Sequence, residues 1–210
     1  MTHCFSRRSF LKGSAAAAAA LTSPLLPADA AFPETENGLF SPVSALCQTQ
    51  YGPVKGREGE NGQLCWYGIP YGAAPTGESR WTAPQEPARW LTVRDCTSPA
   101  PAAYQYTTFP LGTEDCLTLD IYSSAEAKKR PVLVYLHGSA FSGSPQELPG
   151  SALVRDTGCV FVALSYRLGL FGFNCLPAFC SGPEETGNFA LLDMAKALDW
   201  VRDNIAWFGG

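Results

Sequence analysis

The sequence predicts an α/β fold, and three segments in its second half carry that prediction. Residues 132–136 (V-L-V-Y-L) and 159–164 (C-V-F-V-A-L) are short, apolar and β-prone, which is typical of strands buried on both faces of a parallel sheet. Residues 189–208 repeat apolar side chains at spacings of three and four, as an amphipathic helix does. Upstream strands that lead into a strand, a loop, a strand and a helix indicate an α/β fold.

The first thirty residues have the features of an export signal. Arg7 and Arg8 form the arginine pair of a twin-arginine signal, and residues 15–26 form an apolar, alanine-rich stretch too short for a comfortable membrane span. Ala28-Asp29-Ala30 then supplies a small-x-small cleavage pattern. We expect the twin-arginine export machinery to carry the chain and a signal peptidase to cut it after Ala30, which gives a periplasmic or extracellular protein.

Residues 31–210 are long enough for one domain of ordinary size. The whole chain has a net charge of −4, and removing residues 1–30 takes away three basic residues and one acidic residue, leaving −6. No strong basic patch remains, which argues against a nucleic-acid partner. No second long apolar stretch remains either, so we expect no membrane span.

Cysteine usage agrees with an oxidising compartment. Seven of the eight cysteines lie beyond residue 30, an odd number that leaves at least one without a partner in the chain. Cys159 is the expected free thiol, because it begins an apolar strand. Two further pairings are open, Cys175 with Cys180 and Cys47 with Cys65. The chain has no C-x-x-C and only His137 beyond residue 30, so we expect no metal and no cofactor.

The elements before residue 131 are predicted to be shorter. Residues 48–54 and 64–67 have the composition of short strands, the first of them antiparallel. Residues 73–115 are rich in proline, alanine and glycine, which predicts a long ordered surface loop. Residues 117–122 alternate apolar and polar side chains, as a strand with one solvent-facing side would. Residues 128–130 (K-K-R) predict a charged turn.

The loop that follows residues 132–136 is the strongest functional candidate. His137-Gly138 ends the strand, and Ser139 and Ala140 continue with small residues whose backbone N–H groups can point into a cavity and stabilise an oxyanion. The alternative is a plain turn at the end of a strand. Three serines near this loop are not expected to be nucleophiles, because the chain has no G-x-S-x-G elbow and residues 31–210 have no histidine besides His137 to act as a base: Ser139, Ser142 and Ser144.

The predicted helix has both ends marked in the sequence. Asn188 is a suitable N-cap, and Gly209-Gly210 a suitable stop. Its apolar stripe comprises Leu191, Ala195, Leu198, Val201 and Ile205.

Five segments together resemble the type-B carboxylesterases, and they occur in that family's order across most of residues 68–210. They are G-I-P-Y-G-A-A-P-T-G-E-S-R-W (68–81), E-D-C-L-T-L-D-I-Y (114–122), P-V-L-V-Y-L-H-G-S-A-F-S-G (131–143), S-Y-R-L-G-L-F-G-F (165–173) and residues 187–210. The resemblance implies the N-terminal, incomplete part of an α/β-hydrolase domain over residues 31–210. It also implies a serine esterase that acts through an acyl-enzyme on a small-molecule ester.

The resemblance assigns a role to each residue of the loop. The N–H groups of Ser139 and Ala140 would bind the oxyanion, and Gly138 would permit the bend. The family usually has glycine where Ser139 stands, so a side chain there must fit the backbone geometry. Phe141 would line the acyl pocket or pack in the core. The nucleophile, acid and base would all lie beyond Gly210, so these 210 residues alone are expected to be inactive.

The resemblance also implies three structural pairs. Cys96 and Cys116 would form a disulfide that closes the long loop. Arg80 with Glu114, and Arg167 with Asp193, would be buried ion pairs that pin loops beside the catalytic face. Two alternatives to an esterase stay open: a catalytically inactive, esterase-like binding protein, and a non-functional truncated fragment with exposed sheet edges.

Overall fold

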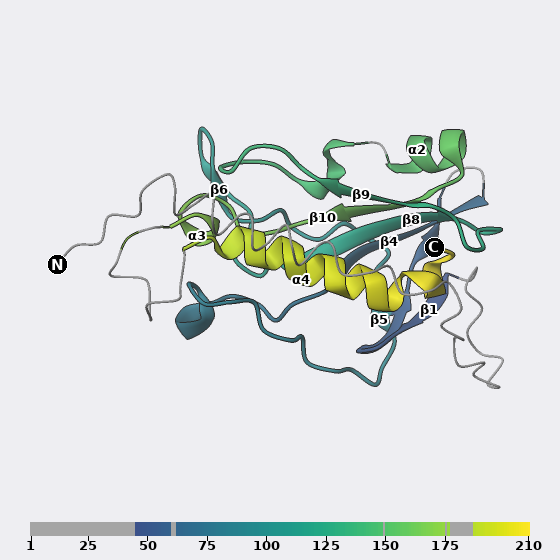
Figure 1. The fold of residues 1–210 in the computed structure, drawn as a ribbon, viewed down its shortest axis with the longest axis horizontal. Helices are drawn as coiled ribbons and strands as arrows, with labels where there is room; N and C mark the ends of the chain where they lie inside the picture. Colours follow the sequence, from purple (N-terminus) through teal and green to yellow (C-terminus); the bar gives the residue numbers. More distant parts are fainter. Residues whose placement is uncertain (1–44, 60–61, 149, 175, 177–186) are drawn as a thin grey trace, which may run out of the picture. The chain divides into compact units, whose positions relative to one another are not determined.

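The structure is a computed structural model that describes residues 45–59, 62–148, 150–174, 176 and 187–210 (Figure 1). These residues form a five-stranded sheet, a three-stranded sheet and a two-stranded hairpin. The strands are β1 (Leu46–Thr49), β2 (Gly52–Lys55), β3 (Arg57–Glu58), β4 (Gln63–Pro70), β5 (Arg94–Asp95), β6 (Gln105–Tyr106), β7 (Pro110–Leu111), β8 (Thr118–Ser124), β9 (Val132–Leu136) and β10 (Val160–Leu164). The helices are α2 (Gly150–Thr157), α3 (Gly169–Gly172) and α4 (Phe189–Asn204), with 3-10 turns η2 (Gly77–Ser79), η3 (Pro145–Glu147) and η5 (Ile205–Phe208).

The five-stranded sheet has the order β3-β4-β8-β10-β9. Strands β4, β8 and β10 pair antiparallel, and β10 then pairs parallel with β9, so that Val162 lies opposite Ile121 on one side and Val134 on the other. The parallel pair is joined through α2, which makes β9, α2 and β10 a β-α-β unit. The α/β prediction is therefore confirmed.

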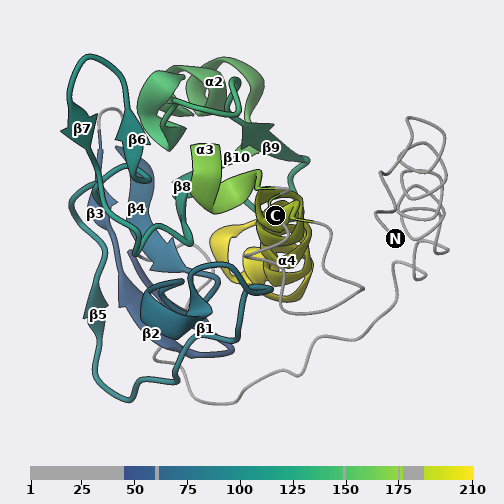
Figure 2. The ribbon, with the colours of Figure 1, turned by 90° about the vertical axis from the view of Figure 1, so that its left-hand side faces the viewer.

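Alternate residues of β10 pack on opposite faces of this sheet, as the two-residue period of a strand requires. Phe161 and Ala163 belong to the apolar cluster beneath α2. Val160 and Val162 belong to the larger cluster beneath α4. Figure 2 shows α2 and α4 on the two sides of the sheet.

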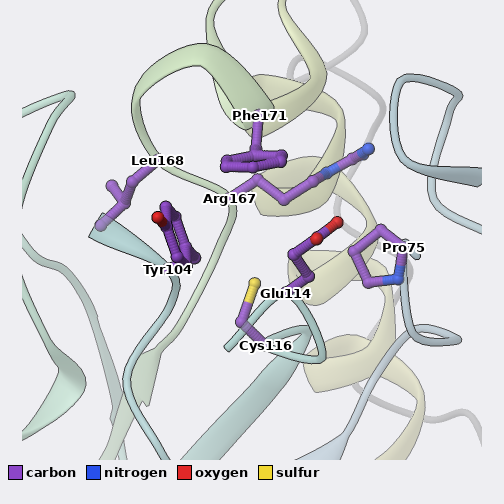
Figure 3. A pocket seen from close by; sticks show the side chains of 7 residues that line it. All are labelled: Pro75, Tyr104, Glu114, Cys116, Arg167, Leu168 and Phe171. Carbon is purple, nitrogen blue, oxygen red and sulfur yellow. The ribbon is translucent and has the colours of Figure 1, made fainter. Parts of the chain in front are cut away.

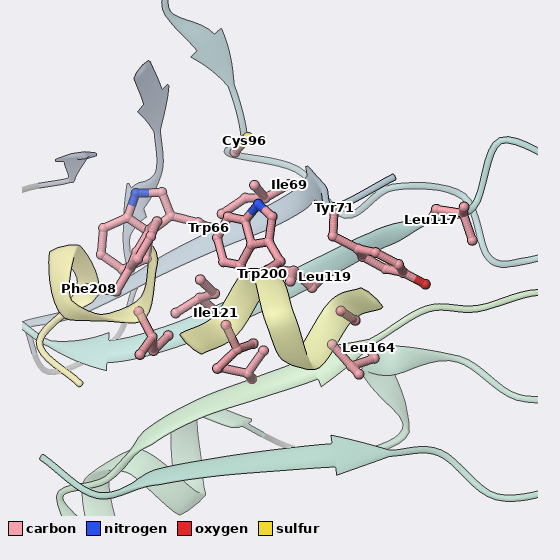
Figure 4. Close-up of a cluster of buried hydrophobic side chains, with 14 of the residues drawn as sticks. Trp66, Ile69, Tyr71, Cys96, Leu117, Leu119, Ile121, Leu164, Trp200 and Phe208 are labelled. Atoms are coloured by element: carbon pink, nitrogen blue, oxygen red, sulfur yellow. The ribbon is translucent and has the colours of Figure 1, made fainter. Parts of the chain in front are cut away.

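The larger cluster contains most of the bulky buried side chains (Figure 4). Trp66 of β4 meets Phe208 of η5 edge to face, with ring centroids 4.9 Å apart. Trp200 of α4 also packs against Phe208, at 6.2 Å. These aromatic contacts fix α4 and η5 on the sheet. Helix α4 in turn supports residues 165–169, which lie near the candidate site.

Helix α4 begins where the sequence predicts, but it ends at Asn204, continues to Phe208 as the 3-10 turn η5, and turns a different face to the core. Asn188 is the N-cap residue, although its side chain makes no capping hydrogen bond, and Gly209 ends the following turn with a left-handed φ of +92°. Leu191, Ala195 and Leu198 of the predicted stripe are exposed. The buried positions have the same helical spacing but a shifted phase, and they are Phe189, Ala190, Asp193, Ala197, Trp200, Val201 and Asn204.

Two strand predictions are wrong about burial. Strand β9 is the edge strand of the described sheet, and Leu133 and Leu136 are 46% and 43% exposed, so it is not buried on both faces. Strand β8 lies between β4 and β10, and its polar residues Thr118 and Asp120 are buried rather than solvent-facing. The alternation of polar residues predicted that one side of β8 faces solvent, but neighbouring elements cover that side.

Residues 73–115 are mostly irregular, as predicted, but short pairings secure them. Strand β5 adds to β2 in the three-stranded sheet, and β6 and β7 form a hairpin. Two-residue strands leave too little pattern in the sequence to be recognised in advance.

The expected disulfide between Cys96 and Cys116 is absent from the structure, where both thiols are free and buried. The carbonyl of Cys96 accepts a hydrogen bond from the Tyr67 N–H, whereas the carbonyl beside Cys116, that of Leu117, accepts from the Tyr71 N–H. Burial raises the pKa of each thiol to about 12, so both stay protonated.

The open pairing of Cys47 with Cys65 is also absent, because the two residues belong to apolar clusters on different sides of the structure. Cys47 lies on β1 and donates from Sγ to the Trp207 carbonyl at 3.3 Å. Cys159 is buried and free, as predicted. Cys175 and Cys180 lie outside the described residues, as do Arg7, Arg8 and the predicted cleavage site.

Candidate active site

Residues 138–143, called here the 138–143 loop, connect β9 to η3 and are held at three places. At the start, the Tyr166 hydroxyl donates to the carbonyl of His137. In the middle, the Gly169 N–H donates to the carbonyl of Ala140 at 2.7 Å. At the end, the side-chain amide of Gln105 bonds to Gly143. The loop is therefore anchored at both ends and at its centre.

His137 supports the loop from inside. Its ring is buried and stacks on the Tyr166 ring, with centroids 4.3 Å apart and planes 9° from parallel. Burial lowers the pKa of this histidine, so the ring is neutral at physiological pH. A neutral, stacked imidazole at this position acts as packing for the loop.

Ser139 adopts a backbone conformation that favours glycine, with a φ of +68°. Placing an L-residue in this left-handed region costs about 1–2 kcal/mol. The Ser139 Oγ accepts long hydrogen bonds from the N–H groups of Phe141 and Ser142, at 3.3 and 3.4 Å, which offset part of that cost. The side chain therefore fits the loop by bonding back to it.

The N–H groups of Ser139 and Ala140 donate to no acceptor within the described part of the chain. Gly138 and Ser139 are exposed, and Ala140 is half-buried. Two successive main-chain donors are thus available on a loop whose ends are fixed. Main-chain donors that are fixed before a reaction can stabilise a developing oxyanion, because they require little reorganisation.

Gly138 was expected to permit the bend of the loop, but the structure requires glycine at a different position. Gly138 has no positive φ, and a Cβ built there meets open space, so the bend does not depend on it. Gly143 has a φ of +143°, and a Cβ there would lie 2.3 Å from Nδ1 of His137. The turn is therefore made at Ser139 and Gly143, because the loop reverses there to pack against His137.

Arg167 and Asp193 fix the segment that supports the loop. Their side chains are 2% and 0% exposed, and two hydrogen bonds, Nη2 to Oδ1 at 2.6 Å and Nε to Oδ2 at 2.8 Å, join them. The Arg167 Nη1 also donates to the carbonyls of Arg80 and Thr82. Burial raises the pKa of Asp193, and the hydrogen bonds from Arg167 oppose that rise. The pair ties α4 to residues 165–169, from which Tyr166 and Gly169 reach the loop.

Arg80 and Glu114 also pair, through Nε to Oε2 at 2.6 Å and Nη2 to Oε1 at 2.9 Å. Their side chains are 34% and 24% exposed, so this pair is not buried as expected. The reason is its position on irregular segments outside the sheet. The Arg80 guanidinium lies over the rings of Trp81 and Phe171, at 5.5 and 5.8 Å.

The other residues considered near the loop have structural or solvent-facing positions. Ser144 caps η3, with its Oγ accepting from the Gln146 N–H and its own N–H donating to Glu147. Phe141 is 68% exposed and so does not pack in the core. The described residues include no group of three or more acidic, cysteine or histidine side chains that could hold a metal ion.

Sequence reasoning missed the side chains that hold the loop. Gln105 lies 38 residues upstream, and nothing in its neighbourhood signals a contact with Gly143. Tyr166 and Gly169 stand in the quoted segment S-Y-R-L-G-L-F-G-F, but only the fold shows that they face the loop. Gly143 was visible as a glycine in a small-residue run, and that signal alone did not show its steric need.

Comparison with solved structures defines the class of protein. The chain superposes on a carboxylesterase of Geobacillus stearothermophilus with a TM-score of 0.73 at 39% identity, covering 79% of this chain and 35% of that one. A PNB esterase structure gives a TM-score of 0.70 at 40% identity, covering 79% and 36%. The five-stranded sheet and its helices are therefore part of an α/β-hydrolase fold.

Residues 43–210 match the Carboxylesterase family, and the chain belongs to it. It is 42% identical over 177 residues to the para-nitrobenzyl esterase of Bacillus subtilis (strain 168), covering 79% of this chain and 36% of the relative. It is 38% identical over 175 residues to the fumonisin B1 esterase of Sphingopyxis macrogoltabida, covering 77% and 32%. The chain thus spans about a third of the length of these relatives.

Residues 4–24 match the twin-arginine translocation signal sequence. The predicted export route is confirmed, and with it a location in the periplasm or outside the cell. In the part of the chain that the structure describes, no helix is long and apolar enough to cross a membrane.

Proposed function

We propose that residues 31–210 form the N-terminal part of an exported serine carboxylesterase and supply its oxyanion-binding loop. The observation that carries this proposal is the pair of unbonded N–H groups, those of Ser139 and Ala140, on a loop anchored at both ends. The chain contains no G-x-S-x-G, so the nucleophile, acid and base would come from residues outside these 210. Residues 1–30 would be removed after export, with cleavage following Ala30.

In the proposed reaction, a serine hydroxyl attacks the ester carbonyl carbon while a histidine takes its proton. The carbonyl oxygen becomes an oxyanion, which the N–H groups of Ser139 and Ala140 would bind. The C–O bond to the alcohol then breaks, and the alcohol leaves with the proton from the histidine. Water repeats the sequence on the acyl-enzyme and releases the carboxylic acid. Loss of one such donor lowers kcat by about 100-fold to 1,000-fold.

The relatives suggest the substrates to try first. The Bacillus subtilis relative carries the name para-nitrobenzyl esterase, so we propose small apolar aryl and benzyl carboxylic esters as substrates. The exposed Phe141 beside the open N–H groups supports an apolar acyl or alcohol group. No cofactor is needed for acyl transfer by this route.

Two assays test the proposal. The 210-residue chain is expected to hydrolyse no para-nitrophenyl ester and to take no label from a fluorophosphonate, because it lacks the nucleophile. The product of a reading frame that continues into a serine elbow is expected to do both. In that product, replacing Ala140 by lactic acid removes one N–H and is expected to lower kcat by about 100-fold or more at little change in KM.

Robust labelling of the 210-residue chain would contradict the proposal. So would an unchanged kcat after the Ala140 replacement. A continuing frame without the serine would support an esterase-like binding protein instead.

A further inference from the structure

The side chain of Gln105 bonds to both backbone polar groups of Gly143. Its Nε2 donates to the Gly143 carbonyl at 2.9 Å, and its Oε1 accepts from the Gly143 N–H at 3.0 Å. Residues opposite each other in an antiparallel sheet exchange the same two hydrogen bonds. The Gln105 amide therefore takes the place of a strand residue. Its second Nε2 proton goes to the Ala103 carbonyl at 3.1 Å, and the side chain is buried.

We propose that Gln105 is a positioning residue that sets the orientation of the Ser139 and Ala140 N–H groups. This inference rests on the proposed function, since it concerns how the oxyanion loop is held. Gln105 touches no reacting atom. It acts through Gly143, which closes the loop.

The path from Gly143 to the two donors is short. Any side chain at position 143 would meet His137, so Gly143 has one place to lie, and Gln105 holds it there. Phe141 and Ser142, just before it, donate their N–H groups to the Ser139 Oγ. Releasing Gly143 loosens these two residues and with them the Ser139 side chain. The loop then keeps only its anchors at His137 and Ala140.

The backbone on either side of Gln105 is itself held in place. Tyr104, the residue before it, packs edge to face on Phe171 of α3, with centroids 5.3 Å apart (Figure 3). A bridge between Ala103 and Thr113 closes the base of the hairpin made by β6 and β7. The Tyr104 N–H donates to the Thr113 carbonyl at 2.8 Å. Because the backbone around Gln105 is hydrogen-bonded and packed in this way, the Gln105 side chain can hold Gly143 in a fixed position.

The test uses Gln105→Glu and Gln105→Leu in the 210-residue chain. A protonated Glu matches Gln in shape and supplies one O–H donor and one carbonyl acceptor, whereas its carboxylate has no donor for the Gly143 carbonyl. We expect Gln105→Glu to show wild-type amide shifts for Ser139, Ala140 and Gly143 near pH 4, and altered shifts near pH 7. Gln105→Leu is expected to show altered shifts at both pH values and about tenfold faster exchange of the Gly143 amide.

Gln63→Glu is the matched control. Gln63 is also a buried glutamine, but its Nε2 bonds to the Ser151 carbonyl, away from the loop. The control is expected to leave the three amide signals unchanged at both pH values. Wild-type spectra at each pH account for titration of His137, the imidazole that packs against the loop.

A purely structural role for Gln105 would lower thermal stability without moving the Ser139 and Ala140 signals, and that result would overturn the proposal. Failure of acid pH to restore the Gln105→Glu spectrum would also overturn it. These readouts need no turnover. An inactive product of a reading frame that continues into a serine elbow would therefore contradict the proposed function and leave the loop measurement to be judged separately.

Discussion

The 138–143 loop and the structure beneath it hold their polar groups in opposite ways. The buried frame, which comprises β8, β10, α4 and residues 165–169, encloses the charges of Arg167 and Asp193 and bonds them to each other. The loop is largely exposed, is held by one hydrogen bond each from Tyr166 and Gly169 and by two with Gln105, and leaves two N–H groups open. The frame pairs its buried charges with each other, whereas the loop keeps two N–H groups available.

This difference shows how a binding loop can be rigid without contributing much stability. Open N–H groups give nothing to folding, and the left-handed Ser139 costs free energy. The frame supplies what the loop lacks, because residues 165–169 belong to the frame and also reach the loop. Changes in the frame should therefore affect stability strongly, and changes in the loop weakly.

The largest effect is expected from breaking the buried ion pair. Asp193→Ala would leave the Arg167 guanidinium buried without its partner, which lowers the free energy of unfolding by about 3–5 kcal/mol. Glu114→Ala removes one partner of the half-exposed pair and is expected to cost no more than about 1 kcal/mol. Urea unfolding of the two variants measures the difference. Equal losses of unfolding free energy in the two variants would show that burial does not make the frame's ion pair more important for stability than the half-exposed pair.

A smaller, pH-dependent effect is expected where the frame meets the segment after the loop. Asp120 of β8 accepts from the Gly68 N–H at 2.9 Å and from the Gln146 Nε2 at 2.6 Å. Burial raises the pKa of Asp120 to about 6, against a value near 3.9 for an unfolded chain. The folded state holds the proton more tightly, so stability falls as the pH rises from about 4 through about 6. Asp120→Asn removes the ionisation. We expect this variant to have a free energy of unfolding about 2–3 kcal/mol above that of the wild type at pH 8, and equal to it near pH 3.

Thermal unfolding across pH 3–8 checks this expectation. Asp115→Asn, which removes an exposed carboxylate, serves as the control and should keep the wild-type pH profile. A gain for Asp120→Asn that is equal at all pH values would contradict the account.

The smallest effect is expected inside the loop, at Ser139. Alanine is normally more stabilising than glycine, because glycine has more freedom in the unfolded chain. At the left-handed φ of Ser139 the order should reverse, with Ser139→Gly more stable than Ser139→Ala by about 1 kcal/mol. Ser142, which has no positive φ, offers the matched pair and should show the usual order. Denaturant unfolding of the four variants measures these differences in stability. If alanine is more stabilising than glycine at both positions, Ser139 is unstrained.

The sequence predicted the elements well where a pattern was local. The runs 132–136 and 159–164 became β9 and β10, and Gly209 ended the helical segment as expected. It predicted burial poorly, because burial depends on neighbours far along the chain. Leu191 and Leu198 had helical spacing but face outward, and Asp120 has a polar side chain but is buried, with hydrogen bonds from Gly68 of β4 and Gln146 of η3.

The candidate site divides in the same way. Gly138, Ser139 and Ala140 were visible as a small-residue run after a strand. The side chains that hold that run in place, Gln105 and Tyr166, were not visible, since each reaches it from another segment. A disulfide between Cys96 and Cys116 was expected from resemblance alone, and both thiols are free and buried in the structure.

The source DNA beyond codon 210 tests the central claim most directly. We expect the frame to continue and to encode a G-x-S-x-G elbow, to which the 138–143 loop supplies the oxyanion donors. A stop codon directly after Gly210, or a continuing frame in which that serine is replaced, would contradict it.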